Sequence, residues 1–90
     1  MSLPLHSFLE KIMEITLFRE IIEHYAKVHA NISCIHCGEL INFIRDNENK
    51  ENSAERKIAQ IIPNIYNQGK VKQIAEIAGY QVENYVICTK

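Results

Sequence analysis

Two cysteines separated by two residues, Cys34 and Cys37, have the clearest capacity for chemistry in this sequence. Two thiolates at this spacing can share a zinc ion, and His36, another histidine or Cys88 could supply further ligands. In a βαβ context the same spacing would indicate thiol–disulfide exchange. The sequence has no second matching pair and no βαβ pattern, so we expect no metal ion and two small buried thiols at a helix start.

No other set of side chains is typical of an active site. There is no Ser/His/Asp set and no pair of carboxylates placed for acid–base catalysis, and three glycines give little material for a phosphate-binding loop. The polar segment over residues 46–53 lacks the glycine and the glutamate of a calcium loop. We therefore expect a protein that is not an enzyme and that uses no cofactor.

The C-terminal stretch from Val71 to Lys90 has a different pattern. Ala75 stands where two crossing helices approach closely and only a small side chain fits. Gly79 stands where a turn with positive φ favours glycine. Apolar residues flank both positions at helical spacing: Ile74, Ala78, Tyr80, Tyr85 and Cys88. The pattern predicts a helix-turn-helix over residues 71–90.

This stretch resembles known DNA-binding motifs. Residues 71–79 (VKQIAEIAG) are similar to the opening of the lactose-repressor-type helix-turn-helix. Ile74-Ala75, Gly79-Tyr80 and Tyr85 resemble the second helix-turn-helix of the AraC family. The resemblance covers only residues 71–90, and it implies a small transcription regulator whose recognition helix begins near Gln81 and enters the major groove.

The motif also implies which side chains meet DNA. Two lysines at the start of the first motif helix would contact phosphates. Polar residues near the start of the second helix would face base edges, because Gln and Asn can pair with adenine and Glu can accept from cytosine. The expected DNA-binding residues are Lys70, Lys72, Gln81, Glu83, Asn84 and Lys90.

Length and composition set the scale of the fold. Ninety residues make one domain near the small end of what folds alone, and 47% hydrophobic residues suffice for a packed core. The net charge is −1, but residues 1–52 carry five Lys or Arg and eight Asp or Glu, whereas residues 53–90 carry five and three. This asymmetry favours a C-terminal DNA face slightly. Three cysteines, no secretory signal and no stretch of membrane-span length favour a cytoplasmic setting.

Apolar residues recur at helical spacing through most of the chain, which predicts an all-α bundle of about five helices. One long helix, or two, should reach Val28, and a second should cover residues 37–46. A third should start after Ser53 and end near Ile62, because Pro63 follows, and the two motif helices complete the bundle. The apolar stripe of the first helix comprises Leu5, Phe8, Leu9, Ile12, Ile15, Phe18, Ile22 and Tyr25.

This stripe is wide for a chain of this size, so we expect a homodimer through the apolar face of residues 5–28. We divide the single helical domain, residues 1–90, into a bundle and dimerisation part (1–52) and a helix-turn-helix part (53–90). The expected partner is DNA in its major groove, or a protein in the alternative that follows.

A second resemblance supports that alternative. Residues 8–86 are similar to the degenerate second EF-hand pair of phosphoinositide-specific phospholipases C. The residues that carry this resemblance are Arg19-Glu20-Ile21-Ile22, Leu40, Phe43-Ile44, Ile61-Ile62 and Tyr85. It implies a non-enzymatic helical module that binds other protein domains and no calcium.

Overall fold

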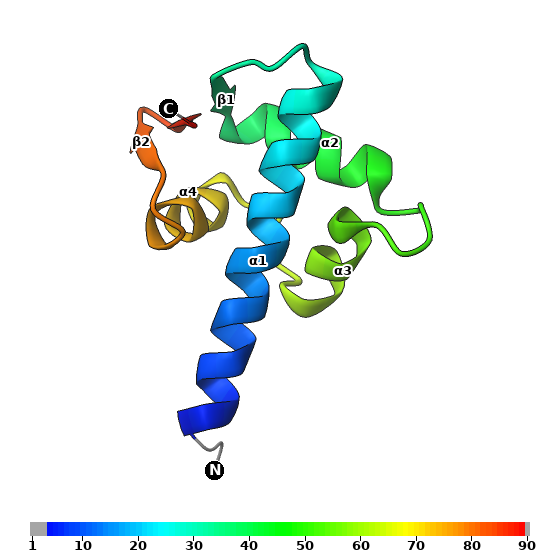
Figure 1. Cartoon of the computed structure of the whole chain (residues 1–90), viewed down its shortest axis with the longest axis vertical. Coiled ribbons are helices and arrows are strands. Elements are labelled where there is room, and N and C mark those ends of the chain that lie inside the picture. The colour runs from blue at the N-terminus through cyan, green and yellow to red at the C-terminus, as the bar shows by residue number, and fades with distance from the viewer. Residues whose placement is uncertain (1–3, 90) are drawn as a thin grey trace.

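The computed structural model describes the backbone of residues 4–89 and the side chains of residues 8–89. Within this range the chain forms four helices and a sheet of three short strands (Figure 1). The elements follow in the order α1 (Pro4–Val28), β1 (Cys34–His36), α2 (Cys37–Asn47), α3 (Ala54–Ile61), α4 (Gln68–Ile77), β2 (Gln81–Glu83) and β3 (Val86–Cys88). The first helical segment is therefore one continuous helix.

Local signals in the sequence set the helix ends. Ser53 caps α3, and its hydroxyl accepts a hydrogen bond from the Arg56 amide at 3.0 Å. This helix ends at Ile61, two residues before Pro63, as the sequence predicts. Gly79 has a φ of 95°, which confirms the turn predicted after the helix that contains Val71.

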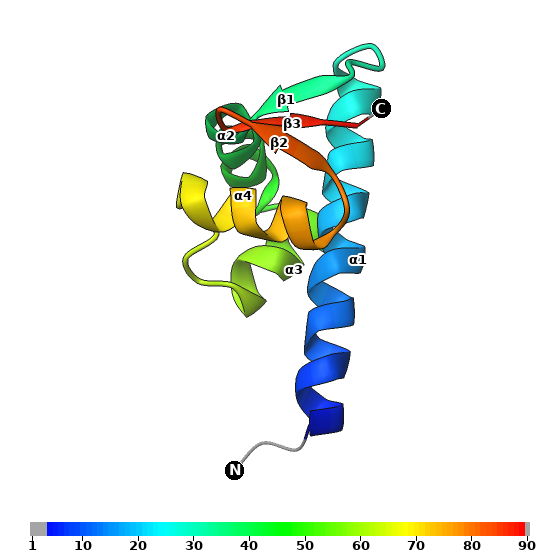
Figure 2. The ribbon, with the colours of Figure 1, turned by 90° about the vertical axis from the view of Figure 1, so that its left-hand side faces the viewer.

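The sheet joins two distant parts of the chain. Its strand order is β1-β3-β2, and both pairings are antiparallel (Figure 2). Ile35 on β1 lies opposite Ile87 on β3, and both side chains are buried. The sheet therefore holds the C-terminal hairpin against the segment that precedes α2.

The prediction of an all-α bundle with five helices is wrong, because residues 81–88 form a β-hairpin where the second motif helix was expected. Asn84 and Tyr85 have positive φ values of 51° and 62°, so the chain reverses there as in a two-residue hairpin turn. β-branched valine and isoleucine side chains on both sides of this turn favour extended strands. The fold is α+β, and no recognition helix begins near Gln81.

One hydrophobic core connects the helices and the sheet. Its buried side chains come from positions between residues 17 and 87, so both parts of the predicted division contribute to it. The largest of these fully buried side chains include Phe18, Ile21, Leu40, Ile44, Ile58 and Ile65. None of the helices in the described part of the chain has the length and apolar character needed to cross a lipid bilayer.

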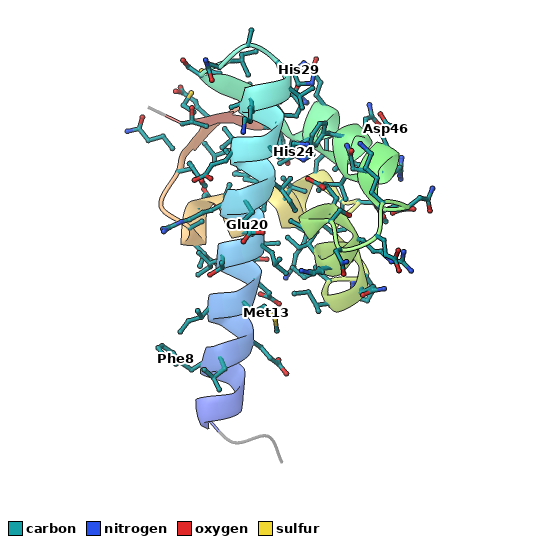
Figure 3. The ribbon with its side chains drawn as sticks, turned by 45° about the vertical axis from the view of Figure 1, so that its right-hand side comes forward. Phe8, Met13, Glu20, His24, His29 and Asp46 are labelled. Carbon is teal, nitrogen blue, oxygen red and sulfur yellow. The ribbon has the colours of Figure 1, made fainter. Side chains whose placement is uncertain are left out.

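Only the C-terminal half of α1 enters this core. Leu17 and Tyr25 are buried there, whereas the half that begins at Pro4 extends beyond the other helices (Figures 1 and 2). Figure 3 shows Phe8 and Met13 on this projecting half, where both remain exposed. The apolar face predicted over residues 5–28 is thus divided between the core of the chain and an exposed stripe. The Leu5 side chain of that face lies outside the described residues.

Candidate nucleic-acid interface

One face of helix α4 is polar and exposed to solvent, because the apolar side chains of this helix pack into the core. Val71, Ile74 and Ala75 are buried on one side of the helix. The guanidinium of Arg19 on α1 donates a 2.7 Å hydrogen bond to the carbonyl oxygen of Ala78, the C-cap residue of α4. These contacts fix the rotation of α4 and leave its opposite face outward.

Polar side chains line this outward face. Gln73 is exposed, and Lys70 and Lys72 are half-buried. Asn67 caps the helix, and its side-chain oxygen accepts a hydrogen bond from the Lys70 amide at 3.2 Å. The face borders a shallow depression, whose lining residues are Asn64, Asn67, Gly69, Lys70, Lys72, Gln73, Glu76 and Tyr85.

We call the hairpin of residues 81–88 the wing. Its strands pair with Gln81 opposite Cys88 and Glu83 opposite Val86. Ile87 is fully buried and anchors the wing on the core, while β3 pairs with β1 on its other edge. The wing therefore has a fixed position next to α4 (Figure 2).

Tyr85 stands in the turn of the wing in an unfavourable backbone conformation. Bulky residues are rarely found at positive φ, yet Tyr85 has a φ of 62°. Its side chain is 43% exposed, and Lys72 Nζ lies 5.5 Å from the centroid of its ring. The two-residue hairpin turn requires this conformation and fixes the direction of the side chain. Tyr85 thus presents a partly exposed aromatic ring at the edge of the α4 face.

The predicted DNA-binding residues do not lie on two motif helices. Two of them are on the outward face of α4, and three are exposed on the wing: Lys70 and Lys72, then Gln81, Glu83 and Asn84. Lys90 lies outside the described residues. The structure brings the two lysines to the depression, which Gln81, Glu83 and Asn84 do not line.

Sequence reasoning missed several residues of the depression. The sequence pattern does not identify Asn67 as a helix cap, and it predicts Gln73 on the first motif helix, which is not the helix expected to read DNA. It predicts Tyr85 in the apolar core of the motif. The signal that could have identified Tyr85 is the pair Asn84-Tyr85, which can form a two-residue turn. β-branched residues stand on both sides of it, Val82 before and Val86-Ile87 after.

The sequence predicts that Cys34 and Cys37 are both buried at the start of a helix, and the structure shows this for Cys37 alone. Cys37 is buried at the start of α2, whereas Cys34 is exposed and lies beside Cys88, with 3.1 Å between the two Sγ atoms. Burial raises the pKa of the Cys37 thiol, so this group stays protonated at neutral pH. Among the described residues, no group of three or more His, Cys, Asp or Glu side chains is placed to hold a metal ion.

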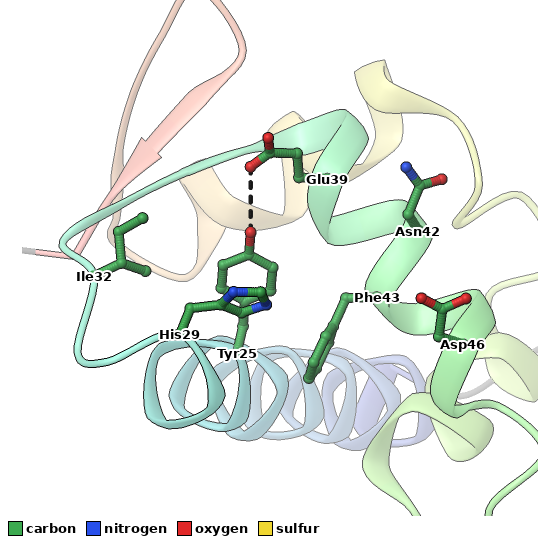
Figure 4. Close-up of a pocket in the computed structure, with 7 residues that line it drawn as sticks. All are labelled: Tyr25, His29, Ile32, Glu39, Asn42, Phe43 and Asp46. Carbon is green, nitrogen blue, oxygen red and sulfur yellow. Dashed lines mark hydrogen bonds between the residues drawn. The ribbon is translucent and has the colours of Figure 1, made fainter.

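A second depression lies between the end of α1 and α2 (Figure 4). The Tyr25 hydroxyl donates a 3.2 Å hydrogen bond to the Glu39 carboxylate, and the His29 ring stacks on Tyr25 with 4.1 Å between centroids. Burial, and then the negative charge of Glu39, raises the pKa of Tyr25. The phenol therefore stays protonated at neutral pH, and its contact with Glu39 holds α1 against α2.

No protein-family model matches this chain, and neither a curated protein nor a solved structure matches it. What the structure defines is an α+β protein with a polar helix face bordered by a β-hairpin. Its function is therefore inferred from that geometry.

Proposed function

We propose that the chain binds duplex DNA, with α4 in the major groove and the wing beside it. One observation carries the proposal: the polar face of α4 is bordered by Tyr85, a partly exposed aromatic residue held at positive φ. The major groove admits an α-helix or a two-stranded β-ribbon, and α4 and the wing lie side by side. The reading helix of this proposal is α4 rather than a helix starting near Gln81.

The order of the elements supports this proposal. Three helices lie between β1 and the wing, and the sheet order β1-β3-β2 holds the wing next to α4. A helix with a β-hairpin beside it offers two elements that the major groove admits, so this arrangement supports DNA binding by analogy alone.

The side chains near α4 suit two kinds of contact with DNA. Gln73 can form a bidentate pair with adenine, and Glu76 can accept a hydrogen bond from cytosine. Lys70 and Lys72 can contact phosphates and so position the helix, and the Tyr85 hydroxyl can donate to a phosphate oxygen. Phosphate contacts thus surround a small set of base-reading groups.

The charge of this surface predicts weak binding by one copy. If the two lysines neutralise two phosphates, the logarithm of affinity falls with the logarithm of salt concentration with a slope of about −2. A net charge of −1 adds no strong long-range attraction. Tight binding therefore requires two linked copies, one on each half-site.

We further propose that two copies pair through the projecting half of α1. Phe8 and Ile12 lie one above the other on this helix, and Leu9 and Met13 form the adjoining row. Ile61 on α3 lies next to Met13. The five side chains are 39% to 61% exposed. Together they expose about 450 Å², taking about 180 Å² for each when fully exposed.

A second copy fits this stripe in symmetry. In an antiparallel pair with its two-fold axis near residue 10, Phe8 would meet the Ile12 of the second copy. Such a pair buries at most about 900 Å² of apolar surface, which is below the roughly 1,200–2,000 Å² of a standard interface and corresponds to a weak dimer. Lys11 lies on the other side of the helix by its periodicity. Glu10 and Glu14 line the same depression as Met13 and Ile61, so these two carboxylates would border the interface.

A mobility-shift assay on pooled duplex fragments, from about 50 to 200 mM salt, tests the DNA proposal. We expect binding that weakens as salt rises, and Lys70→Ala and Lys72→Ala should each flatten the slope by about 0.9. Lys50→Ala is the matched control, because it removes a lysine from the loop between α2 and α3, away from the wing (Figure 1). Absence of binding at the lowest salt would refute the proposal.

Absence of DNA binding would favour the alternative function, a protein-interaction module that binds its partner through the exposed stripe of α1. The stripe is the specific observation in its favour, because contiguous apolar patches of several hundred Å² mark interaction surfaces. Both functions are compatible with the cytoplasmic setting that we propose from the cysteine usage.

A further inference from the structure

We infer that Cys34 and Cys88 form a redox-active thiol pair that a peroxide converts into a disulfide between β1 and β3. The two residues are far apart in sequence but face each other across neighbouring strands. Their Sγ atoms are 3.1 Å apart. This inference does not depend on DNA binding.

The strand register places the two residues where a disulfide can form. The Thr89 amide donates to the Ser33 carbonyl oxygen at 2.8 Å, and the Cys37 amide donates to the Tyr85 carbonyl oxygen at 2.8 Å. Hydrogen-bonded and non-hydrogen-bonded pairs alternate along an antiparallel ladder, so Cys34 and Cys88 form a non-hydrogen-bonded pair. Such pairs have Cα atoms about 4.5 Å apart, within the roughly 4.4–6.8 Å range of disulfides.

The environments of the three cysteines assign a role to each. Cys34 is exposed, so an oxidant in solution can reach it. Cys88 is half-buried beside it, and the pKa of the Cys88 thiol is raised, chiefly by its hydrogen bond with Cys34. Cys37 is fully buried and serves as an internal control that should not react.

The chemistry takes place in two balanced steps. The Cys34 thiolate attacks one oxygen of hydrogen peroxide, forming an S–O bond, breaking the O–O bond and leaving a sulfenic acid and a hydroxide ion. The Cys88 sulfur then attacks Cys34 Sγ, forming the S–S bond and releasing the sulfenic oxygen as water. Two electrons pass from the sulfurs to the peroxide, and the two thiol protons end in the two water molecules formed.

The bond would join the wing covalently to the segment before α2. β3 is the central strand of the sheet and one of the two strands of the wing, so a link from Cys34 to Cys88 prevents β3 from separating from β1. It also closes a loop between residues 54 positions apart, which restricts the unfolded chain. We expect the oxidised protein to melt about 10 °C or more above the reduced protein.

Intact mass spectrometry of the full chain tests the pair. The protein is treated with hydrogen peroxide, freed of oxidant, unfolded and labelled with N-ethylmaleimide. We expect three labels on the untreated protein and one on the treated protein, with a peptide map that joins Cys34 to Cys88. Dithiothreitol should restore three labels, and Cys37→Ser should still form the bond.

Cys34→Ser and Cys88→Ser are the paired variants. Cys34→Ser should keep two labels after treatment, whereas Cys88→Ser should keep one, because its Cys34 is oxidised to sulfenic acid or beyond and has no second thiol with which to form a bond. Three labels on the treated wild-type protein would overturn the inference. So would a disulfide that involves Cys37, a bond between two chains, or sulfinic acid at Cys34 in place of the bond. Circular dichroism of both serine variants before treatment checks that they are folded.

Discussion

Replacement of Ile12 by glutamate tests the pairing of two copies through the projecting half of α1. Ile12 is 45% exposed and belongs to the stripe that also contains Phe8, Leu9 and Met13. At about 180 Å² for a fully exposed side chain, Ile12 contributes about 80 Å² to each copy. In a two-fold dimer the substitution therefore removes about 160 Å² of buried apolar surface.

At about 25 cal/mol per Å² this loss weakens the dimer by about 4 kcal/mol, which is close to a thousandfold in the dissociation constant. The buried carboxylates of two glutamates near the two-fold axis weaken it further. The folded monomer should be unaffected, because the first α1 side chain packed against the core is Ile15, three residues beyond Ile12.

Sedimentation equilibrium over micromolar to hundred-micromolar concentrations measures this effect. We expect a wild-type dimer and an Ile12→Glu monomer with an unchanged far-UV circular dichroism spectrum. Lys27→Gln is the control, because it alters the net charge by the same amount at an exposed position near the other end of α1. A wild-type monomer at every concentration, or an Ile12→Glu protein that still forms dimers, would refute the proposed interface.

Three further predictions concern the fold. Gly79→Ala should destabilise the chain by about 1–2 kcal/mol, because φ is 95° while no atom lies within 4 Å of the added Cβ; an unchanged thermal midpoint would contradict this. The pKa of Tyr25 is raised from 10.0 by burial and then by the charge of Glu39, so its contribution to stability is complete below pH 10 and is lost as pH rises through the folded-state pKa. Urea unfolding at rising alkaline pH should show a shallower decline for Tyr25→Phe than for the wild type. His24→Ala should cost about 1–3 kcal/mol in urea unfolding, because it removes the 3.0 Å partner of the buried Glu55 carboxylate; a change below half a kcal/mol would show that water replaces His24.

The helices could be predicted from the sequence where local and tertiary signals agree. Ser53 and Pro63 set the ends of α3 through a side-chain cap and a missing amide, both of which are local effects. The helical spacing of apolar residues also predicts α1 and α2, because this spacing can be read from the local sequence alone. The division of α1 into a buried and a projecting half was not predictable, since it depends on how far α3 and α4 reach along it.

The wing was missed because its sequence is compatible with two structures. Val82, Val86 and Ile87 can serve as apolar helix positions or as strand residues, and short runs of this kind are ambiguous by periodicity. The turn at Asn84-Tyr85 lacks the glycine that usually marks a two-residue hairpin. Pairing with the distant strand β1 decides between the two structures.

The candidate site could be predicted only in part for the same reason. Lys70 and Lys72 were found because they lie on a correctly predicted helix. Gln73 and Tyr85 were not assigned to the site, because only the hairpin brings Tyr85 beside α4. A side chain that reaches its neighbours through long-range strand pairing leaves little signal in a single sequence.

Two-dimensional amide NMR of the labelled chain, titrated with duplex DNA at low salt, tests the DNA-binding proposal most directly. We predict chemical-shift changes at Gly69 and Gln73 on α4 and at Tyr85 on the wing, with little change around Tyr25 and Glu39. No change at excess DNA, or changes confined to the depression between α1 and α2, would contradict the proposal.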